Sequence, residues 1–232
     1  MPETVPTAAW TSESAIRVQI GSAVSAETRA RVHAAYRALR RAGLAGLVDI
    51  TPAYTTILLT FDPLRVDDPD AALAAVRGRL GGLAEEAPPV PRTVEIPVCY
   101  DAAFAPDLAD VAAMHGLSVA EVIAMHAGAE YEVDFLGFSP GFPYLNGLPQ
   151  RLATPRLETP RPRVPAGSVA IGGGQAGIYP QATPGGWRII GRTPRRLFDA
   201  DRPEPALLSA GDGVRFVPIS PARFAELAEG ST

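Results

Sequence analysis

The sequence predicts an α+β fold made of two domains, and three observations support this prediction. Residues 16–83 show apolar periodicities in the order β-α-β-β-α. Residues 85–91, EEAPPVP, are rich in proline and have no periodicity, as expected for a linker. From Ala129 onward, short segments of period-two alternation are separated by glycine and proline, which is typical of a β-barrel or sandwich. We therefore predict an α+β domain over residues 1–91, linker included, and a barrel domain over residues 92–232.

The first domain is expected to be a small split-βαβ, or ferredoxin-like, sandwich. Its strands are predicted where apolar residues alternate, at 16–20, 48–50 and 57–61. Ser25 is predicted to cap the first helix, and Asp68 with Pro69 to start the second. His33 lies among the arginines of the first helix and is expected on the surface.

The second domain is predicted to combine two short helices with several strands. A strand at 94–98 either completes the first sheet or opens the second domain, and the sequence leaves both open. Ser118 and Glu121 form a capping-box pattern for the second of two helices predicted between 106 and 127. The remaining predictions are strands at 131–135, 169–171, 187–189 and 214–216, and a final helix from Ser220.

The composition excludes several classes of protein. No apolar run approaches the roughly 18 residues of a membrane span, and the N-terminal residues lack the pattern of a secretory signal. The lone Cys99 cannot form an internal disulfide, which fits the cytoplasm. No metal-ligand spacing such as HxxxH or CxxC is present, so no metal site is expected.

All 21 basic residues are arginine, and the net charge is −4. Without lysine the chain can form neither a P-loop nor a Schiff base by itself. Because the chain is acidic overall, nucleic-acid binding is not expected either.

Residues 137–194 are the most unusual part of the chain. They hold ten prolines, eleven glycines, five aromatic residues and six arginines, but one acidic residue, Glu158. Glycine and proline in such number prescribe an ordered, irregular backbone, and loops of this kind often carry binding surfaces. The arginines favour an anionic ligand. The alternative is six solvated arginines scattered around one domain.

Three motifs in this stretch each have two interpretations. The aromatic side chains of GFSPGFPYL (residues 137–145) either form a wall for a small ligand or plug one end of a barrel. Gly172, Gly173 and Gly174 either expose backbone N–H groups to an oxyanion or form a tight hairpin. In PGGWRIIGRTP (residues 184–194), the two arginines on either side of Ile190 either lie side by side or point into water.

His115 and His126 both fall on apolar helix faces, where a buried, hydrogen-bonded histidine is the usual outcome. His126 is nevertheless the preferred candidate for a general acid or base, because it ends a helix shortly before three acidic residues.

In this order, the motifs GFSPGFPYL, PRPRVPAGSVAIGGGQAGIYP and PGGWRIIGRTP resemble those of the family formed by the B subunits of 5-oxoprolinases. The family is also described as allophanate hydrolase subunit 1, the carboxyltransferase C and D subdomain, or the Kip-type inhibitor of a sporulation histidine kinase. The resemblance extends from Ala15 to Ile219. It implies a ferredoxin-like N-terminal domain followed by a cyclophilin-like β-barrel domain.

The resemblance also implies a function and partners. Members typically work with the C subunit of 5-oxoprolinase, which is a second carboxyltransferase-like protein, and with the barrel-type A subunit. Together these proteins hydrolyse 5-oxoproline to glutamate with ATP. ATP is then expected as a cofactor, shared with or completed by a partner protein. The alternatives are a regulator that binds a sensor histidine kinase and a subunit of an allophanate- or urea-processing carboxyltransferase.

The motifs and the family resemblance together give the roles expected for individual residues. His126 is the expected catalytic residue. The residues expected to contact substrate or anion are Arg156, Arg161, Arg188, Arg192, Gly172, Gly173 and Gly174. The residues expected to line a groove or to form a subunit interface are Phe142, Tyr144, Gln175, Tyr179, Pro184, Gly185, Gly186 and Trp187.

Overall fold

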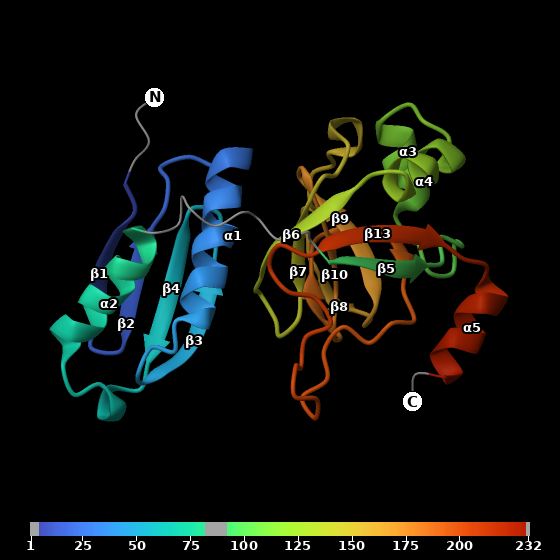
Figure 1. The fold of residues 1–232 in the computed structure, drawn as a ribbon. Helices are drawn as coiled ribbons and strands as arrows, with labels where there is room; N and C mark the ends of the chain where they lie inside the picture. Colours follow the sequence, from blue (N-terminus) through green and yellow to red (C-terminus); the bar gives the residue numbers. More distant parts are fainter. Residues whose placement is uncertain (1–4, 82–91, 231–232) are drawn as a thin grey trace. The chain divides into compact units, whose positions relative to one another are not determined.

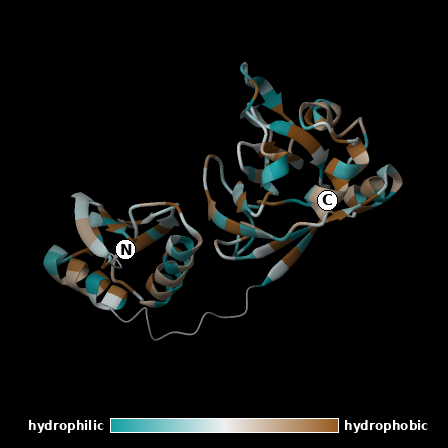
Figure 2. Cartoon of the chain, turned by 90° about the horizontal axis from the view of Figure 1, so that it is seen from above, coloured by the Kyte–Doolittle hydropathy of each residue, from teal (hydrophilic) through white to brown (hydrophobic). Residues whose placement is uncertain are grey.

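The computed structural model describes residues 5–81 and 92–230. The chain divides into two compact units, Met1–Val90 and Pro91–Thr232 (Figure 1). The predicted linker at 85–91 lies outside the described residues. Each unit has a hydrophobic cluster of its own, and hydrophobic residues gather on the strands of both (Figure 2).

The first unit is a four-stranded antiparallel sheet of order β1-β2-β4-β3 with two helices on one face (Figure 1). Its elements are β1 (Thr7–Ser12), β2 (Ala15–Gln19), α1 (Ala26–Arg41), β3 (Leu47–Pro52), β4 (Thr56–Phe61), the 3-10 turn η1 (Pro63–Arg65) and α2 (Pro69–Gly81). Alternation sets the two faces of the sheet. Ile57 and Leu59 are fully buried under the helices, whereas Leu58 between them is 39% exposed.

Both predicted helix starts in this unit are confirmed. The Ser25 hydroxyl accepts a hydrogen bond from the Thr28 N–H at 3.0 Å, and the Asp68 carboxylate accepts from the N–H groups of Asp70 and Ala71, each at 3.0 Å. These side chains satisfy N–H groups that have no partner within the helix.

One expectation about this unit is wrong, and a second is not tested. His33 was expected on the surface but is 2% exposed, because it shares the inner face of α1 with Val32. The strand beside β2 is β1, which the sequence pattern did not predict. In a split-βαβ sandwich, the strand at that position follows the second helix. The predicted α+β class is confirmed, and the ferredoxin-like description of this unit stays a prediction.

The second unit is built around a seven-stranded sheet of order β12-β9-β10-β7-β6-β13-β5, with a two-stranded ribbon, β11-β8, beside it (Figure 1). Its strands are β5 (Thr93–Val98), β6 (Tyr131–Leu136), β7 (Pro143–Asn146), β8 (Arg161–Val164), β9 (Ser168–Gly172), β10 (Gln175–Ile178), β11 (Thr183–Gly185), β12 (Arg188–Arg192) and β13 (Gly213–Pro218). Its helices are α3 (Leu108–Met114), α4 (Val119–Ala127) and α5 (Pro221–Glu229), with the 3-10 turn η3 (Gln150–Leu152). The strand at 94–98 therefore belongs to this unit, where it pairs in parallel with β13.

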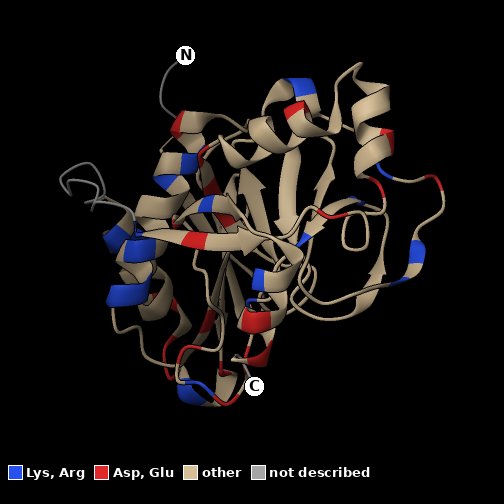
Figure 3. Cartoon of the chain, turned by 90° about the vertical axis from the view of Figure 1, so that its right-hand side faces the viewer, with Lys and Arg blue, Asp and Glu red and all other residues tan. Residues whose placement is uncertain are grey.

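The sheet curls into a nearly closed barrel because its two edge strands meet. Cys99, directly after β5, and Arg192, at the end of β12, exchange backbone hydrogen bonds of 2.8 and 2.9 Å. Side chains from all seven strands fill the interior, and residues of α3 and α4 such as Val111 and Val122 join the same cluster. The predicted β-barrel is confirmed, as is the capping box of Ser118 and Glu121. Charged residues lie mostly on helices, loops and strand ends (Figure 3).

Within the described part of the chain, no single helix is long and apolar enough to cross a membrane. The helices α3 and α4 reach that length and composition together, as a pair bent by 98°.

Candidate functional site

A second, smaller hydrophobic cluster lies on the outer face of the barrel wall. On β9, Val169 and Ile171 point into the barrel interior, whereas Ala170 points outward into this cluster. The ribbon β8-β11 contributes Val164. The members with aromatic rings are Phe142, Tyr144, Tyr179 and Trp187, named here the aromatic cluster.

The rings of the aromatic cluster pack edge to face. The ring centroid of Phe142 lies 5.1 Å from that of Tyr144, 5.2 Å from that of Tyr179 and 5.7 Å from that of Trp187, distances at which aromatic pairs attract. Phe142, Tyr179 and Trp187 are 2%, 2% and 5% exposed, and Tyr144 is half-buried. Three of the four rings expected to line a groove are thus packed inside a core.

Polar groups gather around the Tyr179 hydroxyl at the edge of the aromatic cluster. Burial raises the pKa of Tyr179, while a hydrogen bond from the Trp187 backbone and the positive charges of Arg156 and Arg161 act in the opposite direction. The net pKa lies above the usual value, so the phenol keeps its proton at neutral pH and can donate to an acceptor. Two of the four predicted arginines thus act electrostatically on the same hydroxyl.

Arg161 is held by a buried carboxylate. Its Nη2 atom donates to Asp107 Oδ1 at 2.6 Å, and Asp107 Oδ2 accepts from the Ile189 N–H, also at 2.6 Å. Asp107 is 3% exposed, so its negative charge needs partners within the protein. These two donors supply them. Arg161 Nη1 is buried and has no hydrogen-bond partner among the described residues, so it is an unsatisfied buried donor.

Arg156 is exposed, and its guanidinium carbon lies 5.6 Å from the centroid of the Trp187 ring. Stacking on an aromatic face fixes the guanidinium plane without using its donors. The exposed Arg156 and the more buried Arg161 and Tyr179 are our candidates for binding a small anion, and they are named here the anion site.

The other two predicted arginines donate to backbone carbonyl groups. Arg188 donates to the Pro155 carbonyl at 3.4 Å, whereas Arg192 donates to the Ala166 carbonyl at 2.8 Å and lies over the ring of Phe224 on α5. A bulge between Ile189 and Gly191 breaks the alternation along β12. The two guanidiniums contact different carbonyl groups, and their placement side by side stays a prediction.

The glycine motif forms a hairpin. Gly172 pairs with Gln175 across the β9-β10 turn, and Gly173 exchanges hydrogen bonds of 2.7 and 3.1 Å with Thr154. The Gly173 N–H is therefore occupied by a carbonyl and does not face an anion. Gly173 and Gly174 are both exposed. The structure supports the hairpin interpretation over the oxyanion cradle.

The remaining predicted residues support the aromatic cluster from β10, β11 and the turn after β11. Gln175 is half-buried on β10, and Pro184 is exposed on β11. A Cβ atom at Gly185 would lie 2.3 Å from the Tyr179 hydroxyl, so this position requires glycine. Gly186 accepts a hydrogen bond from the Leu157 N–H at 2.7 Å and so anchors the segment that carries Arg156.

His126 lies in the barrel interior, away from the anion site. It is fully buried, its Nδ1 is 2.8 Å from the Tyr100 hydroxyl, and its ring stacks on Phe216 at 4.4 Å between centroids. Burial lowers the pKa of His126 to about 3, so the ring is neutral. Because its ring is fully buried and packed against Tyr131 and Phe216, the structure favours the alternative of a core histidine.

We expect His126 to make the stability of the second unit depend on pH. In the unfolded chain its pKa is about 6.5, so between that pH and about 3 the unfolded state binds one more proton than the folded state. Stability should fall as the pH falls through this window, with a slope of about 1.4 kcal/mol per unit from this group.

The variant His126→Gln, which retains an acceptor for Tyr100 but cannot titrate, tests this expectation. Urea unfolding at several values between pH 4 and 6 should show a shallower pH dependence than the wild type by about one proton. Equal slopes would show that His126 does not control acid sensitivity.

Asp107 is a buried partner of Arg161 that the sequence pattern did not reveal. Its position directly before α3 is typical of a helix cap, yet its side chain makes no capping hydrogen bond and is used by Arg161 and Ile189. The only signal in the sequence was an acidic residue flanked by apolar ones. Among residues 5–81 and 92–230, no group of three or more His, Cys, Asp or Glu side chains could hold a metal ion.

Comparison with known proteins gives one family and several relatives. Residues 6–208 match the family described as carboxyltransferase domain, subdomain C and D. The chain is 42% identical over 217 residues to the B subunit of 5-oxoprolinase from Bacillus subtilis (strain 168), covering 90% of each chain. It is 58% identical over 135 residues to the protein of the same name from Escherichia coli O157:H7, covering 58% of this chain and 62% of that one.

Among solved structures, that of TTHA0988 is 41% identical with a TM-score of 0.78. The match covers 89% of this chain and 40% of that one, so this chain corresponds to less than half of that protein.

Proposed function

The chain belongs to the carboxyltransferase subdomain C and D family, and from this premise we propose that it is the B subunit of a 5-oxoprolinase. With companion proteins it hydrolyses 5-oxoproline to glutamate, coupled to ATP hydrolysis. The 42% identity to the B subunit of the Bacillus subtilis 5-oxoprolinase over 90% of both chains is the observation that carries this proposal.

The anion site supplies a chemical reason for the proposal. 5-Oxoproline carries a carboxylate, and phosphorylation of its lactam oxygen, which would activate the resonance-stabilised amide, adds further negative charge. Arginine binds both groups through charge-assisted hydrogen bonds. In this proposal Arg156 and Arg161 bind the anionic part of the substrate, and the protonated hydroxyl of Tyr179 donates to it.

Companion proteins complete the reaction. The chain contains no lysine and no P-loop, so it lacks the usual side chain that reaches nucleotide phosphates. We place most of the ATP site on the A or the C subunit of the enzyme, with this chain contributing arginines. His126 is fully buried and its lowered pKa makes it a weak base, so we assign the general base to a companion protein too.

Reconstitution tests the proposal. The purified chain mixed with the A and C subunits of the same organism should release phosphate and glutamate only when 5-oxoproline is present, and the chain alone should release neither. Failure of the mixture to respond to 5-oxoproline would contradict the proposal.

Because the chain belongs to the carboxyltransferase family, we consider a second function, that of a subunit of an allophanate- or urea-processing carboxyltransferase. Phosphate release that depends on urea or allophanate, and not on 5-oxoproline, would favour it.

A further inference from the structure

Phe138 combines exposure with an unfavourable backbone conformation. Its φ is 68°, and it is the one non-glycine residue with positive φ in the described ranges 5–81 and 92–230. Its side chain is 62% exposed. A bulky residue in this region of φ/ψ is strained, so glycine would fold more easily here.

The loop around Phe138 is fixed by three backbone hydrogen bonds. The Ser139 N–H donates to the Gly137 carbonyl at 2.8 Å, which makes Phe138 the centre of a γ-turn, and the positive-φ form of this turn is rare and strained. The Phe142 N–H donates to the Ser139 carbonyl at 3.0 Å across a β-turn with Pro140 and Gly141 at its centre.

Gly141 has a φ of 79°, as the third position of a type II turn requires. A third bond, from the Gly137 N–H to the Phe142 carbonyl at 3.1 Å, closes the loop.

The ring of Phe138 rests on the aromatic cluster. Its centroid lies 5.4 Å from that of Phe142 and 6.3 Å from that of Tyr179, both nearly perpendicular. These contacts orient the ring but leave most of it uncovered. Packing within the chain therefore does not account for a strained phenylalanine at this position, whereas a rigid aromatic anchor is what binding interfaces commonly use.

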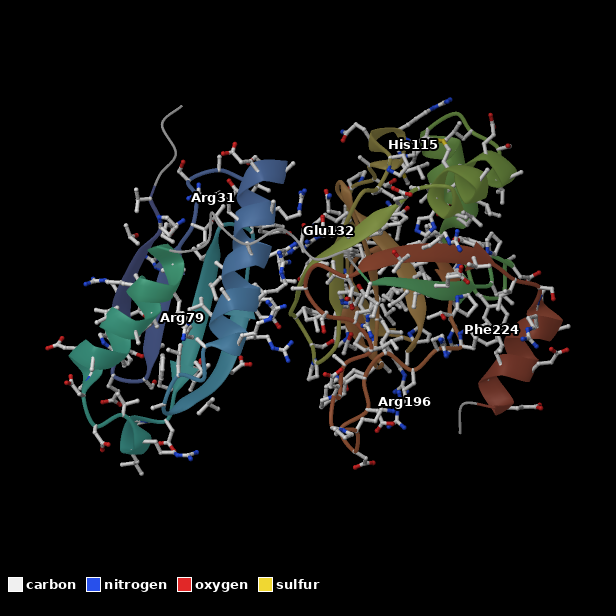
Figure 4. All side chains as sticks on the ribbon, in the orientation of Figure 1. Arg31, Arg79, His115, Glu132, Arg196 and Phe224 are labelled. Atoms are coloured by element: carbon white, nitrogen blue, oxygen red, sulfur yellow. The ribbon has the colours of Figure 1, made fainter. Side chains whose placement is uncertain are left out.

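The surroundings of the ring indicate what it binds. Pro140 at the tip of the same loop is also exposed, so the loop presents a projecting apolar surface, whereas small-molecule sites are concave. Arg156 and Arg161 act on Tyr179, against which Phe138 packs. Phe198 packs against Gly141, and Arg196, two residues earlier on the loop between β12 and β13, forms an ion pair with Asp199 at 3.3 Å (Figure 4). Arg156 is exposed without a described ion pair, so a complementary surface has an apolar pocket with acidic side chains at its rim.

We propose that the loop 137–142 is a docking element in which Phe138 inserts into an apolar, acid-rimmed pocket of a companion protein. This inference rests on the proposed function, which supplies the C subunit of 5-oxoprolinase as the partner. The loop is pre-organised, so docking does not require the ring or the backbone to become ordered. The strained backbone conformation is already present in the free chain.

The variant Phe138→Gly separates docking from folding. Glycine relieves the positive φ, so the melting temperature should be unchanged or higher, while the Kd for the purified C subunit should rise about 30-fold or more, as for a central aromatic anchor. Phe138→Tyr, which keeps the ring, should bind like the wild type. Met114→Ser, a substitution of another exposed apolar residue (48% exposed), is the matched control and should leave the Kd unchanged.

Titration calorimetry of the full-length variants with the C subunit measures these values. An unchanged Kd for Phe138→Gly, an equal loss for Met114→Ser, or a large fall in melting temperature for Phe138→Gly would overturn the inference. Reconstituted 5-oxoproline-dependent activity of the wild type tests the proposed function separately. An active complex that tolerates Phe138→Gly rejects the docking element alone, and a wild-type chain that does not bind the C subunit rejects both.

Discussion

Replacing Arg161 by glutamine should destabilise the second unit by about 3 kcal/mol, because it leaves a buried carboxylate without its cationic partner. Asp107 is 3% exposed and would retain one donor, the Ile189 N–H. The measurement is urea unfolding followed by the fluorescence of Trp187. A Trp10→Phe background removes the other tryptophan of the chain, which lies in the first unit.

The double variant Arg161→Gln with Asp107→Asn is the matched control. Two neutral amides can hydrogen bond to one another, and an asparagine at 107 can still accept from the Ile189 N–H, so most of the lost stability should return. If the single and double variants were equally unstable, the cost would come from lost packing of the long arginine side chain and not from the unpaired charge.

The second large effect is expected in the glycine hairpin. A Cβ atom at Gly172 would lie 2.7–2.8 Å from three atoms of the Trp187 ring system, which packs inside the aromatic cluster. Gly172→Ala should therefore lower the free energy of unfolding by about 2–3 kcal/mol through overpacking. The same urea unfolding experiment measures it.

Gly174→Ala, two residues away in the same hairpin, provides the comparison. A Cβ atom there would meet no atom within 4 Å, so its effect on stability should stay within about 0.5 kcal/mol. Anion binding should survive Gly174→Ala as well. Because alanine keeps the backbone N–H, a loss of substrate binding without a loss of stability would show that substrate approaches this turn closely enough for a methyl group to exclude it.

The sequence predicted the regular elements well because they carry strong local signals. Ser25, Asp68 and Ser118 each cap a helix where expected. The strands with β-branched alternation, β2, β4, β9 and β13, all form. By contrast β1, TAAWTS, has weak alternation and is ordered mainly by pairing with β2. Pairing between distant segments cannot be predicted from local periodicity.

The candidate site was only partly predictable for the same reason. Composition favoured an anionic ligand for residues 137–194, and two of the arginines there act electrostatically on the Tyr179 hydroxyl. The bulge in β12 between Ile189 and Gly191, and the reach of Arg161 to Asp107 on another segment, depend on tertiary structure. Phe138 was visible as a residue of a turn motif, but its positive φ and its exposure were not.

The anion site is tested most directly by the KM for 5-oxoproline of the reconstituted complex carrying Arg156→Gln. Arg156 is exposed and stacks on Trp187 without a described ion pair, so this substitution should leave stability nearly unchanged. We expect the KM to rise about tenfold or more, consistent with the loss of a charge-assisted hydrogen bond. Arg163→Gln, at an exposed position on β8, should leave the KM unchanged. A wild-type KM in the Arg156 variant, or equal increases in both variants, would contradict the assignment of the anion site.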